Sequence, residues 1–112
     1  MSKYMQITVT VRPFYQVELR ETFPKLARHL GYLDQDLVQR NPSLYELVTQ
    51  LDKLLYKFDG TRLREVLLQH RQQLQSLHKS IEEEIANWNL AQADRLLYQV
   101  EDIFEEIESE LN

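Results

Sequence analysis

The chain has 112 residues, of which 43% are hydrophobic and 28% are charged, so it is long enough for one folded domain and too apolar for wholesale disorder. It contains no cysteine, which excludes a disulfide framework, thiolate catalysis and cysteine-ligated metal centres. No apolar run approaches the roughly 18–20 residues of a membrane span, and the N-terminal residues lack the apolar core of a signal peptide. We therefore expect a cytoplasmic protein without a membrane segment.

The net charge of −5 is unevenly distributed along the chain. Residues 1–81 contain 12 basic and 8 acidic side chains, whereas residues 82–112 contain 1 basic and 10 acidic side chains. The simplest interpretation is a solvated acidic face on a terminal helix. The alternative is a surface complementary to a basic partner, or to the basic half of the same chain. Nucleic acid is not an expected partner of the acidic half, because phosphates would be repelled.

The first 13 residues differ from the rest of the chain. Residues 6–11 are rich in β-branched side chains and alternate between polar and apolar, which is typical of a strand. The pattern stops at Pro13, and no second segment of this kind could pair with it. We therefore expect residues 1–13 to form an extended or strand-like arm, which either stays unpaired or pairs with a second copy or another partner.

The remaining residues, 14–112, have the apolar periodicity of helices. Only two glycines and three prolines interrupt the whole chain, which favours long elements with few turns. We predict an all-α fold, a small antiparallel helical bundle in a single domain. The expected helices number about four, near residues 22–31, 42–58, 61–87 and 90–111, with Gly31 ending the first.

Two boundaries carry clear sequence signals. Asn41 followed by Pro42 predicts a capping side chain and then proline at the first helical position. Gly60 can adopt the left-handed conformation that ends a helix, and Thr61 can cap the helix that follows.

The two C-terminal helices are expected to carry continuous apolar seams. Apolar residues recur at intervals of three and four along both, which is the pattern of helices packed at a shallow angle. The seam of the third helix comprises Leu63, Leu67, His70, Leu74, Leu77, Ile81, Ile85 and Trp88, and that of the fourth comprises Leu90, Ala93, Leu97, Val100, Phe104, Ile107 and Leu111. Because one small domain has little else to cover both seams, we predict a homodimer in which these helices form the contact.

The single tryptophan, Trp88, lies at the corner between these helices. Asn89 is expected to cap the fourth helix, with Gln92 reaching back to complete a capping box. Trp88 would then pack on Ala93 as a hydrophobic staple. The alternative is that Trp88 is a binding anchor, since half-buried tryptophan is common at binding surfaces.

The sequence offers no recognisable site for chemistry. His70 and His78 are eight positions apart, so they do not have the spacing of metal ligands on one helix, and no Glu-x-x-His motif is present. We interpret His78 and Glu82 as a helix-surface pair, and His70 as a hydrogen-bonded histidine in the core or an interface. The two glycines are 29 positions apart, which excludes a glycine-rich phosphate loop. We therefore predict no catalytic residues, no cofactor, no bound metal and no enzymatic activity.

Aromatic and basic residues supply the candidate binding surface. Tyrosine combines an apolar ring with a polar hydroxyl group and suits half-buried positions and interfaces. Several arginines cluster around the expected corner near Gly60, where they could bind an acidic partner or face the acidic fourth helix. The candidate partner-binding residues are Trp88, Tyr98, Tyr56, Arg62, Arg64 and Arg71.

The last part of the chain resembles helical segments of molecular chaperones. The segments 77–85 and 89–100, which read LHKSIEEEI and NLAQADRLLYQV, are similar to the helical lid of the seventy-kilodalton heat-shock chaperones. The region 65–112 also resembles the C-terminal helical domain of the J-type cochaperone for iron–sulfur assembly. The chain lacks the His-Pro-Asp signature of a J-domain and any nucleotide-binding motif. The resemblance implies a helical protein-binding module without ATPase activity.

These observations lead to three functional hypotheses. The first is a non-enzymatic protein–protein interaction module, such as an adaptor, an assembly factor or a chaperone accessory. The second is a nucleic-acid-associated regulator that uses the basic cluster. The third is a structural subunit of a larger complex. The partner itself is not identified by the sequence.

Overall fold

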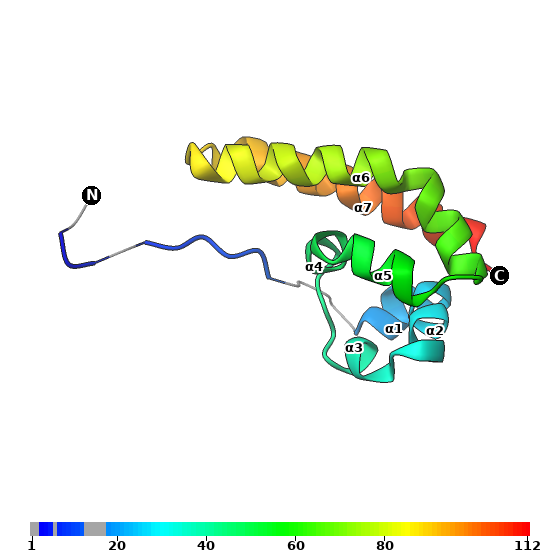
Figure 1. Ribbon diagram of the computed structural model, residues 1–112. Helices are drawn as coiled ribbons and strands as arrows, with labels where there is room; N and C mark the ends of the chain where they lie inside the picture. Colours follow the sequence, from blue (N-terminus) through cyan, green and yellow to red (C-terminus); the bar gives the residue numbers. More distant parts are fainter. Residues whose placement is uncertain (1–2, 6, 13–17) are drawn as a thin grey trace.

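The computed structural model describes residues 3–5, 7–12 and 18–112. Within these residues it contains seven helices and no strand (Figure 1). The helices are α1 (Leu19–Thr22), α2 (Pro24–Leu33), α3 (Gln35–Gln39), α4 (Leu44–Thr49), α5 (Leu51–Lys57), α6 (Arg62–Ala86) and α7 (Leu90–Glu110). The all-α prediction is confirmed, whereas the prediction of about four helices is wrong because the N-terminal half divides into five short helices.

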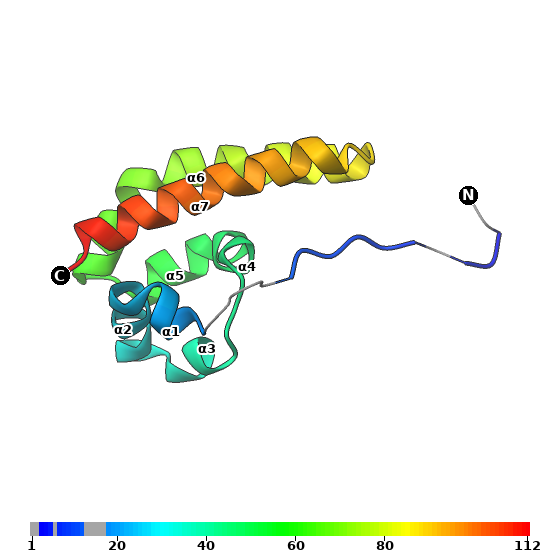
Figure 2. The same cartoon turned by 180° about the vertical axis from the view of Figure 1, so that it is seen from behind.

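Helices α6 and α7 form a long antiparallel hairpin (Figures 1 and 2). Both helices begin and end within one residue of the predicted bounds, because their apolar periodicity is uninterrupted. The side chain of Thr61 accepts a hydrogen bond from the N–H group of Arg64 at 3.2 Å, so Thr61 caps α6 as predicted. Gly60 adopts a φ of 79°, which confirms the left-handed conformation predicted there.

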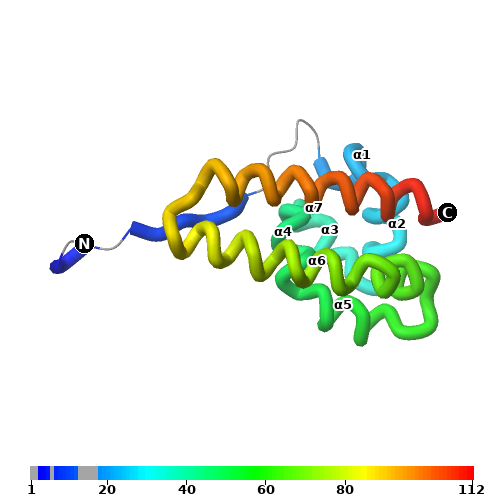
Figure 3. The backbone as a smooth tube through the Cα atoms, turned by 90° about the horizontal axis from the view of Figure 1, so that it is seen from above, coloured from blue at the N-terminus to red at the C-terminus, as the bar shows by residue number. Residues whose placement is uncertain are grey.

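The five short helices lie on one side of this hairpin, away from the turn between α6 and α7 (Figure 3), with α1 and α3 packed on α2. Helices α2 and α4 each contact both α6 and α7, and α5 contacts α6. One cluster of buried apolar side chains extends from Leu19 to Leu111 and includes residues of all seven helices. We call the five short helices, together with the end of the hairpin that they cover, the base, and the end where α6 turns into α7 the tip.

The contact between α6 and α7 and the packing of the short helices cover most of both apolar seams. In α6 the seam is buried as far as Ile81, and in α7 the buried residues include Val100, Phe104 and Ile107. The premise that a single domain leaves both seams uncovered is therefore wrong, and apolar exposure is concentrated near the tip. The homodimer prediction loses its original basis along most of the hairpin.

The single helix predicted over residues 42–58 is divided into α4 and α5 by a break at Gln50. The hydroxyl group of Thr49 donates to the carbonyl oxygen of Tyr45 at 3.0 Å, a bond within the helix that favours bending. The next residue, Gln50, leaves the helical region with φ −105° and ψ 23°. Leu51 then begins α5.

The first predicted helix, 22–31, also has different bounds. Pro24 occupies the first turn of α2 as expected, but the helix continues through Gly31 to Leu33. It ends at Asp34, whose side chain accepts a hydrogen bond from the N–H group of Leu37 at 3.1 Å and so begins α3.

Asn41 does not cap the helix that follows it. Ser43 does so, accepting from the N–H group of Glu46 at 3.0 Å, and α4 begins at Leu44. Asn41 adopts a φ of 53° after α3, and its side-chain oxygen accepts a hydrogen bond of 2.7 Å from the N–H group of Leu19. The side chain thus satisfies a donor at the start of α1, which lies 22 positions earlier in the chain.

An acidic residue of α7 performs a similar role for α2. Both carboxylate oxygens of Glu108 accept backbone hydrogen bonds, from Lys25 at 2.6 Å and from Leu26 at 3.0 Å. Phe23, at the N-cap position of α2, has no side-chain acceptor of its own. Part of the acidic charge of α7 is therefore used to cap a helix of the base.

The described part of the arm is extended but forms no strand, so the strand-like prediction is wrong for residues 7–12 of the single chain. Val9 and Val11 are half-buried, whereas Ile7 is exposed. Positions 1, 2, 6 and 13 of the predicted arm lie outside the described residues. Pairing of the arm with a second copy stays a prediction.

No helix in the described residues combines the length and the apolar composition that a bilayer span requires.

Candidate interaction surface at the hairpin tip

The tip is built around Trp88, which adopts a left-handed backbone conformation with a φ of 60°. The N–H group of Trp88 donates to the carbonyl oxygen of Ile85 at 3.0 Å, and that of Asn89 donates to Glu84 at 2.8 Å. These two bonds form a Schellman motif, which satisfies the last carbonyl groups of α6. Trp88 occupies the position of this motif that glycine usually takes.

A tryptophan at this position is energetically unfavourable. The left-handed conformation brings the Cβ atom close to the following carbonyl oxygen, which costs an L-residue roughly 1–2 kcal/mol. Conformations of this kind persist where the surrounding structure imposes them, and they occur often at binding sites. The conformation of Trp88 is therefore a reason to consider the tip for a function.

The exposure of the indole argues against the staple interpretation. Trp88 is 55% exposed, although Ala93, its expected partner in the staple, is buried. Leu90, on the first turn of α7, is 45% exposed. Two large apolar side chains thus face solvent at the tip, where a binding anchor would lie.

The predicted capping box is absent as well. The side chain of Asn89 makes no capping hydrogen bond. The side-chain oxygen of Gln92 accepts instead from Arg95 at 3.0 Å. The start of α7 therefore lacks the side-chain cap that α6 receives from Thr61.

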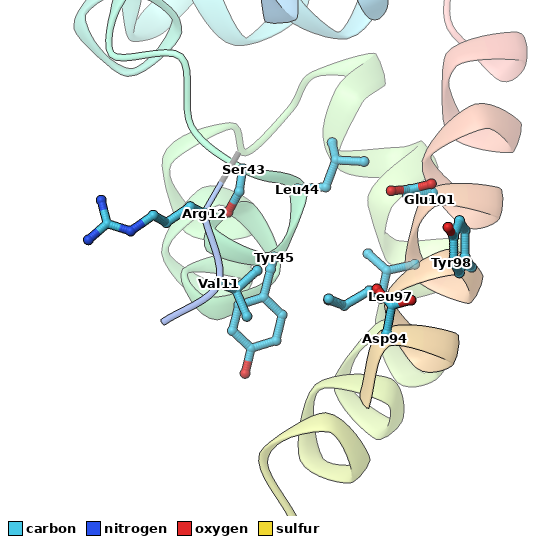
Figure 4. Close-up of a pocket in the computed structure, with 10 residues that line it drawn as sticks. Val11, Arg12, Ser43, Leu44, Tyr45, Asp94, Leu97, Tyr98 and Glu101 are labelled. Carbon is cyan, nitrogen blue, oxygen red and sulfur yellow. The ribbon is translucent and has the colours of Figure 1, made fainter. Parts of the chain in front are cut away.

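A groove lies between α4 and the middle of α7 (Figure 4). It has a volume of about 290 Å³ and is lined by Val11, Arg12, Ser43, Leu44, Tyr45, Asp94, Leu97, Tyr98, Val100 and Glu101. Tyr45 and the arm lie on one side of it, and Asp94, Tyr98 and Glu101 lie on the other. The predicted candidate Tyr98 is 61% exposed. We call this feature the acidic groove.

The charge of the acidic groove is not neutralised within the described residues. Asp94 and Glu101 form no ion pair there, and the side chain of Arg12 extends away from α7 (Figure 4). Partial burial raises the pKa of Glu101, and the neighbouring carboxylates of Glu105, Asp102 and Asp94 raise it further. A cationic group placed in the groove would relieve this repulsion.

Tyr45, on the opposite wall of the groove, is held by contacts with α6. Tyr45 stacks on His78 with ring centroids 5.1 Å apart and an interplanar angle of 18°. Its hydroxyl group donates to the carboxylate of Glu82, and burial followed by this hydrogen bond raises the pKa of the phenol. His78 also lies 3.6 Å from Glu82, which agrees with the predicted helix-surface pair.

The three candidate arginines lie at the base rather than at the tip. Arg62 pairs with Glu65 at 3.2 Å, and Arg71 pairs with Asp52 at 3.2 Å. Arg64 donates to the carbonyl oxygen of Leu55 at 3.0 Å. Each guanidinium group is therefore engaged within the molecule, which leaves the basic cluster with little unpaired charge for phosphate.

The structure thus separates the predicted binding residues into two groups. Trp88 lies at the tip and Tyr98 near the middle of α7, whereas the arginines and Tyr56, which is 88% exposed on α5, lie at the base. The 25 residues of α6 separate Arg62 from the tip by about 37 Å. Sequence reasoning did not single out Leu90, Asp94 and Glu101, although Asp94 and Glu101 lie four and three positions from Tyr98 on the same helix. What only the fold shows is that α4 and the arm line the other side of the groove.

No protein-family model matches this chain, and neither a curated protein nor a solved structure matches it significantly. The resemblance of residues 65–112 to chaperone segments therefore stays a prediction.

Proposed function

We propose that this protein is a non-enzymatic protein–protein interaction module that binds its partner through the tip of the α6–α7 hairpin. The observation that carries the proposal is Trp88, which is 55% exposed and held in a left-handed conformation where glycine would be more stable. Exposed tryptophan is a frequent source of binding energy in protein interfaces. An adaptor, an assembly factor or a chaperone accessory would all use such a surface.

The acidic groove supports a partner with basic side chains. Asp94 and Glu101 are unpaired within the described residues, and Tyr98 between them offers an aromatic ring to a cation. Complementary charge speeds and orients association more than it adds affinity. Trp88 is accordingly the energetic anchor in this proposal, and the acidic groove steers the partner.

Substitution of Trp88 tests the proposal. Tagged wild-type chain and Trp88→Gly are expressed in the native cell, and the proteins that copurify with each are quantified by mass spectrometry. Glycine removes the indole and suits the left-handed position, so the fold is expected to survive. We expect the specific partner to be depleted about 30-fold, which corresponds to an anchor of about 2 kcal/mol.

Tyr56→Ala is the matched control, since Tyr56 is an exposed aromatic residue at the base. It should retain the partner at the wild-type level. Equal capture by wild type and Trp88→Gly would contradict the proposal, and loss of the partner in Tyr56→Ala alone would move the binding surface to the base.

Self-association through the tip is a second form of the same proposal. Trp88 and Leu90 are the exposed apolar residues from which a two-fold contact would be built. Sedimentation equilibrium should then show a dimer for the wild-type chain and a monomer for Trp88→Gly. A wild-type chain that stays monomeric at all accessible concentrations would exclude the homodimer and leave a different protein as the partner.

A further inference from the structure

Three side chains with metal-binding groups converge across the hairpin near its base. Nε2 of His70 on α6 lies 3.0 Å from a carboxylate oxygen of Glu110 on α7. Glu106 lies four positions before Glu110, on the same face of α7. One ligating atom from each of the three residues lies within 4.8 Å of the other two.

The burial of the three residues differs in a way that suits a metal site open on one side. His70 is 8% exposed and is held within the core, Glu110 is partly buried, and Glu106 is exposed. The histidine is therefore a fixed ligand, whereas Glu106 can move to meet an ion. The exposed side would admit water as a further ligand.

Only one of the two carboxylates, that of Glu110, is hydrogen-bonded to His70. Glu106 places a second negative charge beside the same imidazole, and no lysine or arginine side chain forms an ion pair with either glutamate in the described part of the chain. Arg62 reaches only the backbone carbonyl oxygen of Glu110, at 3.4 Å, and its guanidinium group pairs with Glu65. A cation between the three side chains would offset this charge.

We propose that His70, Glu106 and Glu110 bind a divalent transition-metal ion, of which Zn²⁺ is the representative. One imidazole nitrogen and two carboxylate oxygens suit Zn²⁺ or Co²⁺, whereas Mg²⁺ and Ca²⁺ prefer oxygen ligands alone. Ligands that lie about 2.0–2.2 Å from zinc are separated from each other by about 3–3.5 Å. The 3.0 Å between His70 and Glu110 matches this spacing, and a rotation of the exposed Glu106 side chain completes the set.

Binding requires the unprotonated Nε2 atom of His70 to face the ion, with the imidazole proton on Nδ1. The ion then replaces the hydrogen bond as the link between α6 and α7. Because the unfolded chain does not hold the three ligands together, the ion stabilises the folded state. The site is independent of the tip and of the proposed partner.

Metal titration of the full chain tests this inference. Protein treated with a chelator and then freed of it is titrated with Co²⁺ and followed by visible absorption, and with Zn²⁺ and followed by calorimetry. Glu106→Gln removes one ligand at an exposed position, and Glu105→Gln is the matched control on the adjacent exposed position. Wild type and Glu105→Gln should bind one equivalent of either ion and melt at a higher temperature when it is present.

Glu106→Gln should bind the ion at least about 10-fold more weakly, with an unchanged melting temperature in the absence of metal. His70→Gln should lose the Co²⁺ absorption, and circular dichroism reports whether it is folded. Equal affinity in Glu106→Gln and Glu105→Gln would overturn the inference. So would the absence of Zn²⁺ binding by the wild-type chain at about 1 mM, a concentration that detects even weak sites.

Discussion

The two corners that flank α6 each contain one residue in the left-handed backbone conformation, but the residues differ. At the first corner Gly60 adopts a φ of 79°, and at the second Trp88 adopts a φ of 60°. At the first, Phe58 is buried and Thr61 caps the next helix; at the second, the tryptophan is half exposed and Asn89 makes no capping bond. The buried phenylalanine and the helix cap of the first corner therefore stabilise the fold. The second corner exposes its aromatic side chain, and the backbone conformation of that residue lowers stability.

The largest expected difference between the corners concerns their aromatic residues. Phe58→Ala removes a side chain that is 1% exposed and should lower the free energy of unfolding by about 3–5 kcal/mol. Trp88→Ala removes a side chain that is 55% exposed and should lower it by less than about 1 kcal/mol. Urea denaturation measures both values. Similar losses in the two variants would mean that Trp88 contributes to the core as much as Phe58 does.

Replacement of Gly60 should lower the free energy of unfolding although there is room for a side chain. A Cβ atom at Gly60 would meet no other atom within 4 Å, so the cost of Gly60→Ala arises from the backbone alone. We expect a loss of about 1–2 kcal/mol in the free energy of unfolding, the strain of a left-handed alanine. Thermal unfolding would detect this loss, and an unchanged stability would show that the left-handed position costs little in this chain.

The capping positions of the two corners, Thr61 and Asn89, should show a smaller difference in their contribution to the free energy of unfolding. Thr61→Ala removes the acceptor for the N–H group of Arg64 and should cost about 1 kcal/mol. Asn89→Ala removes no capping hydrogen bond and should be nearly neutral in urea denaturation. A loss of about 1 kcal/mol in Asn89→Ala would indicate that the predicted capping box forms in solution.

The smallest expected effects are electrostatic and opposite in sign. The hydrogen bond from Lys57 lowers the pKa of Asp34, so Asp34 contributes stability that is present above its unfolded value of 3.8 and is lost as the pH falls through its lower folded value. Burial raises the pKa of Glu101, so its ionisation in the folded state disfavours folding, and this cost disappears below its unfolded value of 4.5.

Asp34→Asn should therefore lower, and Glu101→Gln raise, the free energy of unfolding at pH 7, each by under about 1 kcal/mol. Both differences should shrink toward pH 3, because both carboxyl groups become protonated as the pH falls. Denaturation at the two pH values measures them. A loss of stability in Glu101→Gln at pH 7 would show that a cation already neutralises the acidic groove.

The long helices could be predicted from the sequence, because their apolar residues recur without interruption and Gly60 and Thr61 mark the corner. The short helices could not, since their bounds depend on local hydrogen bonds such as that of Thr49 with Tyr45. The cap that Asn41 gives to Leu19 crosses 22 positions and requires the fold itself.

The corner at Trp88 was located correctly but its conformation was not foreseeable. Asparagine tolerates the left-handed conformation better than tryptophan, and asparagine flanks Trp88 on both sides. In the structure Asn87 and Asn89 have φ values of −92° and −83°, and the tryptophan takes the left-handed position between them. The cluster of His70, Glu106 and Glu110 could not be predicted from the sequence, because its members lie on two helices, carry no recognised motif and are brought together only by the fold.

The free energy of unfolding of Trp88→Gly tests the central claim most directly. If Trp88 is an exposed residue held under backbone strain, glycine should raise this free energy by about 0.5–1 kcal/mol, because the relief of strain exceeds the extra entropy of glycine in the unfolded chain. A fall of about 2 kcal/mol or more would contradict the account and identify Trp88 as a packed staple of the corner.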